Sequence, residues 1–502
     1  MFKKILIANR GEIAVRVIRA CRELGIKAAV VYSEVDRGSL HVQLADEAYL
    51  VGPAPARESY LNIDRIIEIA HQARAEAIHP GYGFLAENPD FAARCEQAGV
   101  VFIGPNSRAL RLVGDKLMAR QTMDAAGIPI IPGMKAVGQD FSAYEKEARR
   151  LGYPVMIKAS AGGGGKGMRI VYEEAQLRPA LEAGMREALS AFGDESVYLE
   201  KYIEEPRHVE FQVLADNHGN IVHLFERECS IQRRHQKIIE ETPSPALSAD
   251  LRERMGETAK KVLRVAGYNN AGTVEFLLDK DKNFYFLEVN ARLQVEHPVT
   301  EMTTGVDLVH QQIKIAAGEK LAFSQEDIKQ HGHALECRIY AEDPGRGFLP
   351  SSGKILYLQE PKGPGVRLDS GVFTNWEVPI YYDPILAKLI VWGENRQIAC
   401  QRMRAALQEY AILGIATTIP FLREVITHPE FLAGRTTTNF IDRHLADWCE
   451  AGQDKNLRRI AQAAAAYFEL NRRPEFKGKA APTGMRLSPW QTLGRWRLAG
   501  EE

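Results

Sequence analysis

A run of glycines near residue 165 constrains the fold more than any other feature of this sequence. Five of the six residues from 162 to 167 are glycine, and we expect short apolar strands on either side, at Pro154–Lys158 and Met168–Val171. Such a run is costly in backbone entropy if it forms only a hairpin turn. It also lets backbone N–H groups close on a phosphate without obstruction by side chains. We therefore predict a phosphate-binding lid between two strands, with a flexible surface hairpin as the alternative.

Two lysines add positive charge to this predicted lid. Lys158 ends the first strand, and Lys166 lies within the glycine run. The segment is not a Walker P-loop, because Gly167 rather than Ser or Thr follows the lysine and a strand rather than a helix comes next.

Residues 1–110 alternate short apolar strands with helical patterns, which is typical of a parallel sheet covered by helices. The turn Asn9–Glu12 lacks the G-x-G-x-x-G pattern of a dinucleotide site, which argues against that function. The strands are expected at Ile5–Ala8, Ala28–Tyr32, Ala77–His79 and Val100–Ile103, and the helices at Ile13–Leu24 and Ile63–Ala73.

Later parts of the chain show a mixed pattern. After Asp447 the composition shifts to an Ala-rich helix at Leu457–Tyr467 and then to a basic tail from Arg472. Before that point we expect helices at Ser107–Ala126, Phe141–Leu151 and Arg396–Leu407, long strands and hairpins from about Tyr202 to Thr303, and a β-rich segment at Gly353–Gly393.

The segment Thr273–Asn290 is typical of two strands joined by a polar turn. A hairpin centred on Asp281–Lys282 would pair Leu278 with Tyr285, Phe276 with Leu287, and Glu275 with Glu288. Like charges directly opposite on adjacent strands destabilise a sheet, and a divalent cation between the two glutamates would remove the conflict. Oxygen ligands beside a phosphate loop favour Mg²⁺ or Mn²⁺ over zinc. The alternative is a register in which both glutamates point into water.

Polar and apolar residues alternate strictly from Leu287 to Glu296, as on a strand half-buried against a core. The polar positions are Glu288, Asn290, Arg292, Gln294 and Glu296. These groups predict a site, with metal and phosphates near Glu288 and a second substrate near Arg292 and Glu296. An extended strand would hold the two ends roughly 26 Å apart, at about 3.3 Å per residue, unless the chain bends.

Composition and charge argue against several classes of protein. The chain has 502 residues, 45% hydrophobic and 26% charged, as in soluble proteins with several domains. A net charge of −1 gives no general attraction to nucleic acid or to an anionic membrane. No membrane span or signal peptide is expected, since the apolar runs are short and charged residues interrupt the first one. The six cysteines form no C-x-x-C pair, which favours reduced thiols in a cytoplasmic protein.

Four segments resemble the signatures of the biotin carboxylase family. They are Asn9–Ala14 (NRGEIA), His79–Phe84 (HPGYGF), Arg227–Lys237 (RECSIQRRHQK) and Glu288–Glu301 (EVNARLQVEHPVTE). The resemblance covers residues 1–447, with the motifs in order and at the spacing of the family. It departs from the family at Val289, where methionine is common, and by one extra residue in the Glu275–Glu288 hairpin.

The resemblance implies an α/β and α+β multidomain fold. An N-terminal parallel α/β domain would span residues 1–112, and an ATP-grasp domain residues 113–317, with a glycine-rich lid at about 132–203. A C-terminal β-rich domain would span residues 333–447, and residues 448–502 would form a helical, linker-like tail.

The resemblance also implies a set of ligands for each substrate and cofactor. Glu275, Glu288 and Asn290 would bind Mg²⁺ or Mn²⁺. Lys237, Arg292, Gln294 and the backbone of Val295 would hold bicarbonate. ATP would be held by Lys116, Lys158, Gly163, Gly164, Gly165, Glu200, Lys201, His208, Gln232 and His235, with Ile203 and Leu277 against the adenine.

The implied reaction suits these residue types. Glu296 would act as the general base on bicarbonate. Attack on the γ-phosphate would give carboxyphosphate, while the metal and the lysines neutralise the developing charge. Carboxyphosphate would break down to CO₂ and phosphate, and the phosphate would take the proton from biotin N1. Arg338 would stabilise the biotin enolate; on sequence alone, a strand-surface arginine is the alternative.

The implied partners follow from a missing motif. The chain contains no Met-Lys-Met turn for biotin attachment, so the biotin would be carried by a separate carrier protein, with a separate carboxyltransferase subunit. The family also implies a homodimer. The tail segment 488–498 is similar to the stretch that follows this region in longer acyl-CoA carboxylase chains, but the final acceptor, an acyl-CoA or pyruvate, stays open. Two rival hypotheses are another ATP-grasp ligase and a non-catalytic assembly subunit.

Overall fold

The computed structural model describes residues 1–133, 140–159, 168–192, 194–449, 460 and 462–467. Residues 1–448 form one compact unit, and residues 449–502 form another. In the second unit, residues 460 and 462–467 are helical, and residues 450–459, 461 and 468–502 of the expected tail lie outside the described residues. None of the helices in the described part of the chain has both the length and the apolar character needed to cross a membrane.

The N-terminal part is a five-stranded parallel sheet in the order β3-β2-β1-β4-β5, which confirms the expected parallel arrangement. Its apolar side chains belong to two cores: Ile5, Val17 and Val30 lie in one, and Leu6, Val31 and Ile66 lie in the other. Its elements are β1 (Lys4–Ile7), α1 (Gly11–Glu23), β2 (Lys27–Ser33), the 3₁₀ helix η1 (Glu34–Asp36), α2 (Leu40–Leu44), β3 (Glu47–Gly52), η2 (Ala56–Glu58), α3 (Ile63–Gln72), β4 (Ala77–His79), α4 (Pro89–Gln97) and β5 (Val101–Phe102).

The strand order reverses between β1 and β4, so the segments that follow these strands meet at the carboxyl edge of the sheet. Asn9, after β1, donates from Nδ2 to the backbone oxygens of Pro80 and Tyr82, after β4, both at 2.7 Å. Gly81 has a φ of +64°, and a Cβ there would stand 2.8 Å from Asn9 Nδ2. Glycine is therefore needed at this contact, which joins two of the four signature segments.

Two helices, α5 (Ser107–Gly114) and α6 (Lys116–Ala125), follow this sheet. The expectation of one continuous helix over Ser107–Ala126 is wrong. Asp115 has an extended backbone, and its Oδ1 accepts the Met118 N–H at 2.9 Å. This N-cap begins a new helix and places Lys116 at its first position.

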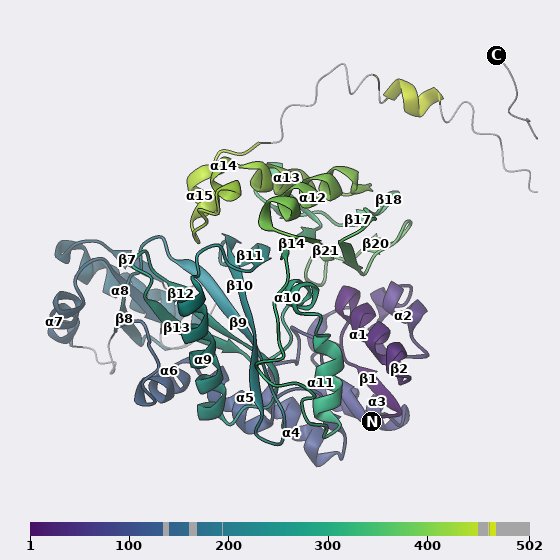
Figure 1. Cartoon of the computed structure of the whole chain (residues 1–502), viewed down its shortest axis with the longest axis horizontal. Coiled ribbons are helices and arrows are strands. Elements are labelled where there is room, and N and C mark those ends of the chain that lie inside the picture. Colours follow the sequence, from purple (N-terminus) through teal and green to yellow (C-terminus); the bar gives the residue numbers. More distant parts are fainter. Residues whose placement is uncertain (134–139, 160–167, 193, 450–459, 461, 468–502) are drawn as a thin grey trace, which may run out of the picture. The chain divides into compact units, whose positions relative to one another are not determined.

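A small antiparallel sheet in the order β7-β6-β8 comes next (Figure 1). It consists of β6 (Val155–Ala159), β7 (Arg169–Val171) and β8 (Val197–Lys201), and it packs with α7 (Phe141–Leu151) and α8 (Glu174–Phe192). The two strands expected on either side of the glycine run are confirmed, and they pair with each other. The glycine run itself, with Gly163, Gly164 and Gly165, lies outside the described residues.

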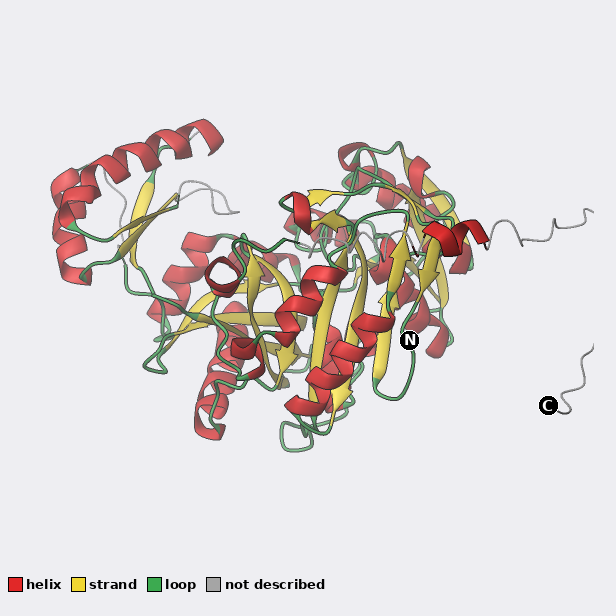
Figure 2. Ribbon diagram, turned by 90° about the horizontal axis from the view of Figure 1, so that it is seen from above, coloured by secondary structure: helices red, strands yellow, loops and turns green. Residues whose placement is uncertain are grey.

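The largest sheet has eight antiparallel strands in the order β13-β12-β9-β10-β11-β14-β21-β19 (Figure 2). Because β11 pairs with β14, the sheet runs continuously from the central part of the chain into its C-terminal part. Its strands are β9 (Arg207–Ala215), β10 (Ile221–Arg233), β11 (Gln236–Thr242), β12 (Asn270–Leu278), β13 (Phe284–Asn290), β14 (His333–Tyr340), β19 (Val366–Ser370) and β21 (Ile385–Gly393).

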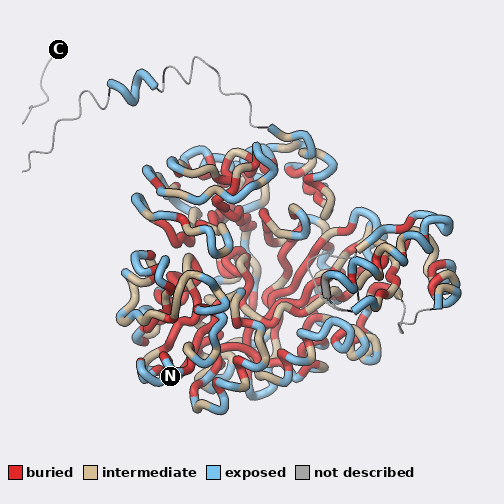
Figure 3. The backbone as a smooth tube through the Cα atoms, turned by 180° about the vertical axis from the view of Figure 1, so that it is seen from behind, coloured by how far each residue is buried: buried red, intermediate tan, exposed pale blue. Residues whose placement is uncertain are grey.

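Helices pack on this sheet, and buried positions follow its strands (Figure 3). The helices are α9 (Ala249–Ala266), α10 (His297–Thr304), α11 (Leu308–Ala316), α12 (Arg396–Glu409), α13 (Ile419–Thr427), α14 (Pro429–Leu432) and α15 (Phe440–His444). The expectation of strands and hairpins alone between residues 202 and 303 is wrong, since α9 lies there. Its Leu251, Met255, Ala259 and Leu263 recur at the spacing of a buried helix face.

Short strand pairs complete the C-terminal part of the first unit. β15 (Glu342–Asp343) pairs with β16 (Leu349–Pro350), β17 (Gly353–Lys354) with β20 (Glu377–Val378), and β18 (Tyr357–Gln359) with β22 (Ala411–Leu413). The 3₁₀ helix η3 (Pro344–Arg346) separates β15 from β16.

The β12–β13 hairpin confirms one expected pair and corrects two. Glu275 lies opposite Glu288, but Phe276 pairs with Phe286 and Leu278 with Phe284. A bulge follows Glu275 and leaves Leu287 unpaired on β13. The bulge absorbs the one-residue difference between the expected turn and the observed one, so the two glutamates still face each other.

The expected strand does not continue to Glu296. β13 ends at Asn290, residues 291–296 form a bent segment, and Glu296 is the N-cap residue of α10. Leu293 is fully buried, as the alternation predicted, but it lies in this bend rather than on a strand. The bend brings the two ends of the polar run into one site.

Candidate active site

Lys237 of β11 lies at the centre of three buried carboxylates. Its Nζ is 2.7 Å from Glu275 Oε1 of β12 and 2.8 Å from Glu296 Oε1. It also donates to Glu210 of β9, which lies opposite Glu275 in the sheet. Glu275, which lies opposite the start of the polar run, and Glu296, at the end of that run, thus share one ammonium group.

These contacts set the protonation of the centre. Burial alone would lower the pKa of Lys237, but Glu210, Glu275 and Glu296 raise it well above its ordinary value. Burial would likewise raise the pKa of Glu296, and Lys237, with Arg338, instead holds it well below the ordinary range. Lys237 is therefore charged and Glu296 is ionised at neutral pH.

Arg338 of β14 reaches the same glutamate from the other side. Its Nη2 donates to Glu296 Oε2 at 3.0 Å, and its Nε donates to Glu240 Oε1 of β11 at 2.6 Å. The Arg338 residue is 7% exposed, so the alternative of a strand-surface arginine is wrong. Glu296 is thus held between a lysine and an arginine at the N-terminus of α10, where the helix dipole also favours a negative charge.

Oxygen donors line one face of the β12–β13 hairpin. Glu275 and Glu288 face each other, and Asn290 donates from Nδ2 to Glu275 Oε1 at 2.7 Å. Cationic side chains lie against both glutamates: Lys116 Nζ is 3.0 Å from Glu288 Oε2, and His208 Nε2 is 3.0 Å from Glu275 Oε2. Opposed carboxylates beside an amide oxygen form a donor set that fits Mg²⁺ or Mn²⁺.

Arg292 ties the bent segment to its surroundings. It donates from Nη2 to Asn290 Oδ1 at 3.1 Å and from Nη1 to Gln294 Oε1 at 2.9 Å. Its Nε donates to Glu87 Oε2 at 2.9 Å. Three expected site residues are thereby connected, and their polar groups lie next to the hairpin carboxylates.

Four of the expected nucleotide ligands form two contacting pairs, Lys158 with Glu200 and Gln232 with His208. Lys158 Nζ lies 2.5 Å from Glu200 Oε2, and burial lowers the pKa of this lysine to about 8. Gln232 contacts His208 at 2.6 Å, which links it to the hairpin. Lys201, by contrast, donates its Nζ to the backbone oxygens of Gly152 and Tyr153.

Three more expected ligands come from separate segments of the chain. His235 lies in the β10–β11 turn with a φ of +66°. Leu277 is half-buried and lies opposite His208 in the sheet, and Ile203 is half-buried in the segment after β8. The next residues, Glu204 and Glu205, line an open hollow of about 430 Å³ with Arg207, Leu278 and Thr437.

The sequence reasoning missed several charged residues at this centre. Glu210 and Glu240 contact the lysine and the arginine described above, and Arg227 donates to Glu210 Oε1 at 2.6 Å. Lys388 of β21 donates to the Val295 carbonyl oxygen at 3.0 Å. One signal in the sequence could have found these residues. They are charged, but they lie in segments whose other residues are typical of buried strands.

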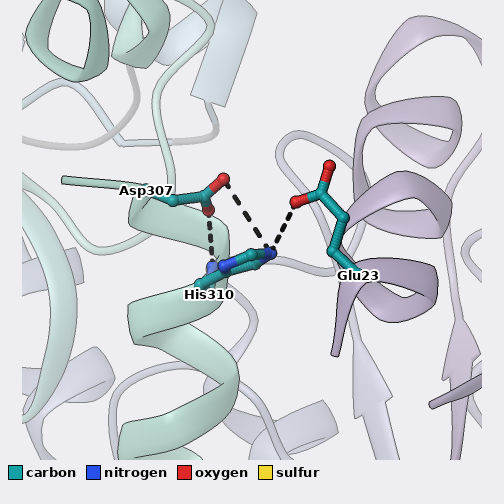
Figure 4. A group of neighbouring side chains, drawn as sticks. All are labelled: Glu23, Asp307 and His310. Carbon is teal, nitrogen blue, oxygen red and sulfur yellow. Dashed lines mark hydrogen bonds and ion pairs between the residues drawn. The ribbon is translucent and has the colours of Figure 1, made fainter. Parts of the chain in front are cut away.

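Another group of ligand-type side chains joins α1 to α11 (Figure 4). His310 Nε2 lies 3.0 Å from Glu23 Oε2 and 4.0 Å from Asp307 Oδ2. Asp307 caps α11 through the His310 N–H, and its Oδ2 accepts from Arg16 at 2.7 Å. Because Arg16 already neutralises Asp307, this group is a network of ion pairs between two helices.

Comparisons with known proteins show the family of the chain. The model of the biotin carboxylase N-terminal domain matches residues 1–110, that of the carbamoyl-phosphate synthase L chain ATP-binding domain residues 115–324, and that of the biotin carboxylase C-terminal domain residues 336–443. A biotin carboxylase from Nostoc is 54% identical over 440 residues, 88% of this chain and 98% of the relative. The chain belongs to the biotin carboxylase family.

Other relatives show the settings in which such chains occur. One of the subunits of the pyruvate carboxylase of Methanothermobacter thermautotrophicus is 55% identical over 463 residues, covering 92% of this chain and 93% of the relative. The biotin carboxylase domain of the 2-oxoglutarate carboxylase of Hydrogenobacter thermophilus, solved with MgADP and bicarbonate, has a TM-score of 0.83 at 50% identity and covers 88% of this chain and 98% of its own. The expected fold class is confirmed, and the enzyme is an ATP-dependent ligase that carboxylates biotin.

Proposed function

We propose that Glu296, Lys237, Arg338 and Arg292 carry out the carboxylation of a biotin that is attached to a separate carrier protein. The observation that carries this proposal is the buried contact of Glu296 with both Lys237 and Arg338, next to the opposed pair Glu275 and Glu288. A base, two cations and a metal-type donor set thus lie within one site, as the transfer of a phosphoryl group to bicarbonate requires.

Each substrate has a place in this arrangement. Lys237 and Arg292, with Gln294 and the backbone of Val295, would hold bicarbonate. Lys116, Lys158, Glu200, Lys201, His208, Gln232 and His235 would hold ATP, with Ile203 and Leu277 against the adenine. Glu275, Glu288 and Asn290 would hold Mg²⁺ or Mn²⁺, which supplies neutralisation of phosphate charge.

Glu296 would take the proton of bicarbonate. In the structure Lys237 binds three carboxylates, so an anionic substrate has to compete with them for its ammonium group. When bicarbonate takes part of that charge, Lys237 stabilises the Glu296 carboxylate less, and the glutamate becomes a better base. Arg338, bound to Glu296 Oε2, would then lie beside the carbonyl oxygen of biotin and stabilise its enolate.

The proposed partners are a biotin carrier protein and a carboxyltransferase subunit, with a second copy of this chain in a dimer. Support comes from relatives that are subunits of larger carboxylases, such as the alpha subunit of the methylcrotonoyl-CoA carboxylase of Dictyostelium discoideum, 50% identical over 99% of this chain and 70% of the relative. Relatives of this kind differ in their acceptor, so an acyl-CoA and pyruvate both remain candidates.

The test is ADP release by the purified enzyme with Mg²⁺, ATP and bicarbonate, measured with and without free biotin. We expect biotin to stimulate ADP release and the stimulation to disappear when bicarbonate is removed. ATP turnover that is indifferent to biotin would contradict the proposal and favour another ATP-grasp ligase.

A further inference from the structure

Two buried glutamates face each other on adjacent strands behind the active site. Glu240 of β11 and Glu336 of β14 are paired in the sheet, and neither is exposed to solvent. Residues so paired have their Cβ atoms about 5 Å apart on the same face. Glu240 Oε2 and both carboxyl oxygens of Glu336 have no hydrogen-bond partner among the described residues. An ionised carboxylate with no partner is costly in such a place.

This pair repeats the arrangement of Glu275 and Glu288 but differs in its surroundings. Lys237 and His208 contact Glu275, and Lys116 contacts Glu288. Glu240, in contrast, has Arg338 as its ion-pair partner, and Arg338 is shared with Glu296. Where cations are too few, two neighbouring carboxyl groups resolve their repulsion by sharing a proton.

The charged groups around the pair agree with a shared proton. Burial raises the pKa of Glu240 to about 7, against the opposing effect of Arg338. Burial also raises the pKa of Glu336 well above its ordinary value, although Lys388 favours its ionised form. Lys388 is itself engaged by Val295 O, by Glu12 Oε2 at 3.3 Å and by Asp369 Oδ2 at 3.8 Å. Glu296 and Lys237 face Glu240 from the active-site side.

We propose that Glu240, which shares one proton with Glu336, is a positioning residue that controls how strongly Arg338 binds Glu296. The guanidinium group lies between the two glutamates, with Nε on Glu240 and Nη2 on Glu296. The inference rests on the proposed role of Glu296 as the base. It adds a pair of residues that touch no substrate but act on the base through Arg338.

In this mechanism Glu240 and Glu296 compete for the positive charge of Arg338. When Glu240 is ionised, it neutralises part of the Arg338 charge, and Glu296 is a stronger base. When the shared proton resides on Glu240, the full charge of Arg338 acts on Glu296, and the glutamate holds a proton less readily. Activity should therefore fall as Glu240 becomes protonated. A group with a pKa of about 7 is ionised in about one molecule in ten at pH 6.

The test compares Glu240→Gln with Glu336→Gln in biotin-dependent ADP release between pH 6 and pH 9. Glu240→Gln keeps an acceptor for Arg338 Nε but removes the charge, so we expect kcat to fall about tenfold at pH 8.5 but only about twofold at pH 6, where Glu240 of the unmodified enzyme is mostly protonated. Glu336→Gln removes the neighbouring carboxyl group and, with it, the mutual repulsion that disfavours two ionised glutamates in this pair. This variant should match the unmodified enzyme at pH 8.5 and retain about five times more of its kcat at pH 6.

The opposite effects of the two variants distinguish this role from a merely structural one. Damage to the fold would lower kcat in both, whereas a gain at pH 6 in Glu336→Gln cannot arise from damage. Equal losses in both variants, or an unshifted pH profile for Glu336→Gln, would overturn the proposal. If Glu240→Gln fails to fold, the pH profile of Glu336→Gln still decides.

Two controls separate this inference from the proposed function. Glu226→Gln also removes a buried carboxylate from the large sheet, but its partner is Arg252, outside the active site, so its pH profile should not change. Glu296→Gln tests the base itself. If Glu296→Gln keeps its turnover, the proposed function fails. If it loses turnover while Glu240→Gln and Glu336→Gln respond alike, the inference about the pair fails alone.

Discussion

At the scale of single residues, the basicity of Glu296 depends on how two cations are distributed. Lys237 serves three carboxylates and Arg338 serves two, so each cation is shared and neither is committed to Glu296 alone. A carboxylate held this firmly is a weak base in the free enzyme. Its basicity can rise when bicarbonate draws the charge of Lys237 away, which would couple deprotonation to the presence of the substrate.

The variant Glu296→Gln tests whether Glu296 is the general base. Glutamine keeps the shape of the side chain but cannot accept a proton, so we expect biotin-dependent ADP release to fall by about 10²- to 10⁴-fold. ATP affinity, measured by equilibrium binding, should stay nearly unchanged because Lys116 and Lys158 remain in place. Unchanged turnover would reject Glu296 as the base. Glu226→Gln is the matched control for a buried glutamate that is paired with an arginine.

Lys116→Ala tests the expected contact of Lys116 with ATP. Lys116 Nζ lies against Glu288, and this side chain is 61% exposed, so it can turn to a nucleotide without disturbing the core. Loss of one charge-assisted contact should raise the KM for ATP about tenfold. The exposed Lys320, which lies after α11, provides the control Lys320→Ala. An unaltered dependence of turnover on ATP would exclude this role.

At the scale of elements, local patterns predicted well and long-range contacts did not. The pairing of Glu275 with Glu288 followed from a hairpin whose strands are neighbours in sequence. The contact of Arg338 with Glu240 depends on the register between β11 and β14, which are separated by about 90 residues and meet only through the tertiary fold. A bend was considered in this run, but its position after Asn290 was not predicted, because alternation alone does not show where a strand stops.

The β11–β14 junction also carries a pH-dependent part of the stability. Glu241 accepts from His333 Nε2 at 2.7 Å and from Arg396 of α12 at 2.7 Å. Burial opposes ionisation, but His333 and Arg396 lower the pKa of Glu241 from 4.5 to about 2. Because the folded-state pKa is the lower one, this stabilisation is complete above pH 4.5 and is lost as the pH falls toward 2.

Glu241→Gln should therefore destabilise the enzyme by about 3 kcal/mol at pH 7, since it breaks a buried ion pair. The measurement is the apparent melting temperature, which should drop at pH 7 and differ less from that of the unmodified enzyme at pH 4. Arg435→Ala removes an exposed ion pair with Glu430 and serves as a control with little effect. A difference that is the same at both pH values would show that ionisation of Glu241 contributes nothing.

At the scale of the whole molecule, the residues of the proposed site come from distant parts of the chain. Lys116 follows the parallel sheet, Lys237 and Glu296 belong to the central part, and Arg338 lies on β14. All these residues lie in the unit of residues 1–448, whose large sheet passes from the central part into the C-terminal part. The carboxylation of biotin should therefore require the whole of this unit rather than any one of its expected domains.

Removal of residues 449–502 tests whether the second unit takes part in the chemistry. The truncated chain keeps every described residue that is assigned to the site. It also keeps the three hydrophobic cores that contain Leu6, Ile339 and Ile5, so we expect it to fold. Its release of ADP in response to free biotin should match that of the full chain. The complete reaction, with carrier and carboxyltransferase added, should be lost or slowed if the tail serves assembly. A fall in the biotin-dependent half-reaction itself would show that the tail belongs to the catalytic unit. Equal rates in both assays would leave the tail with no part in either step.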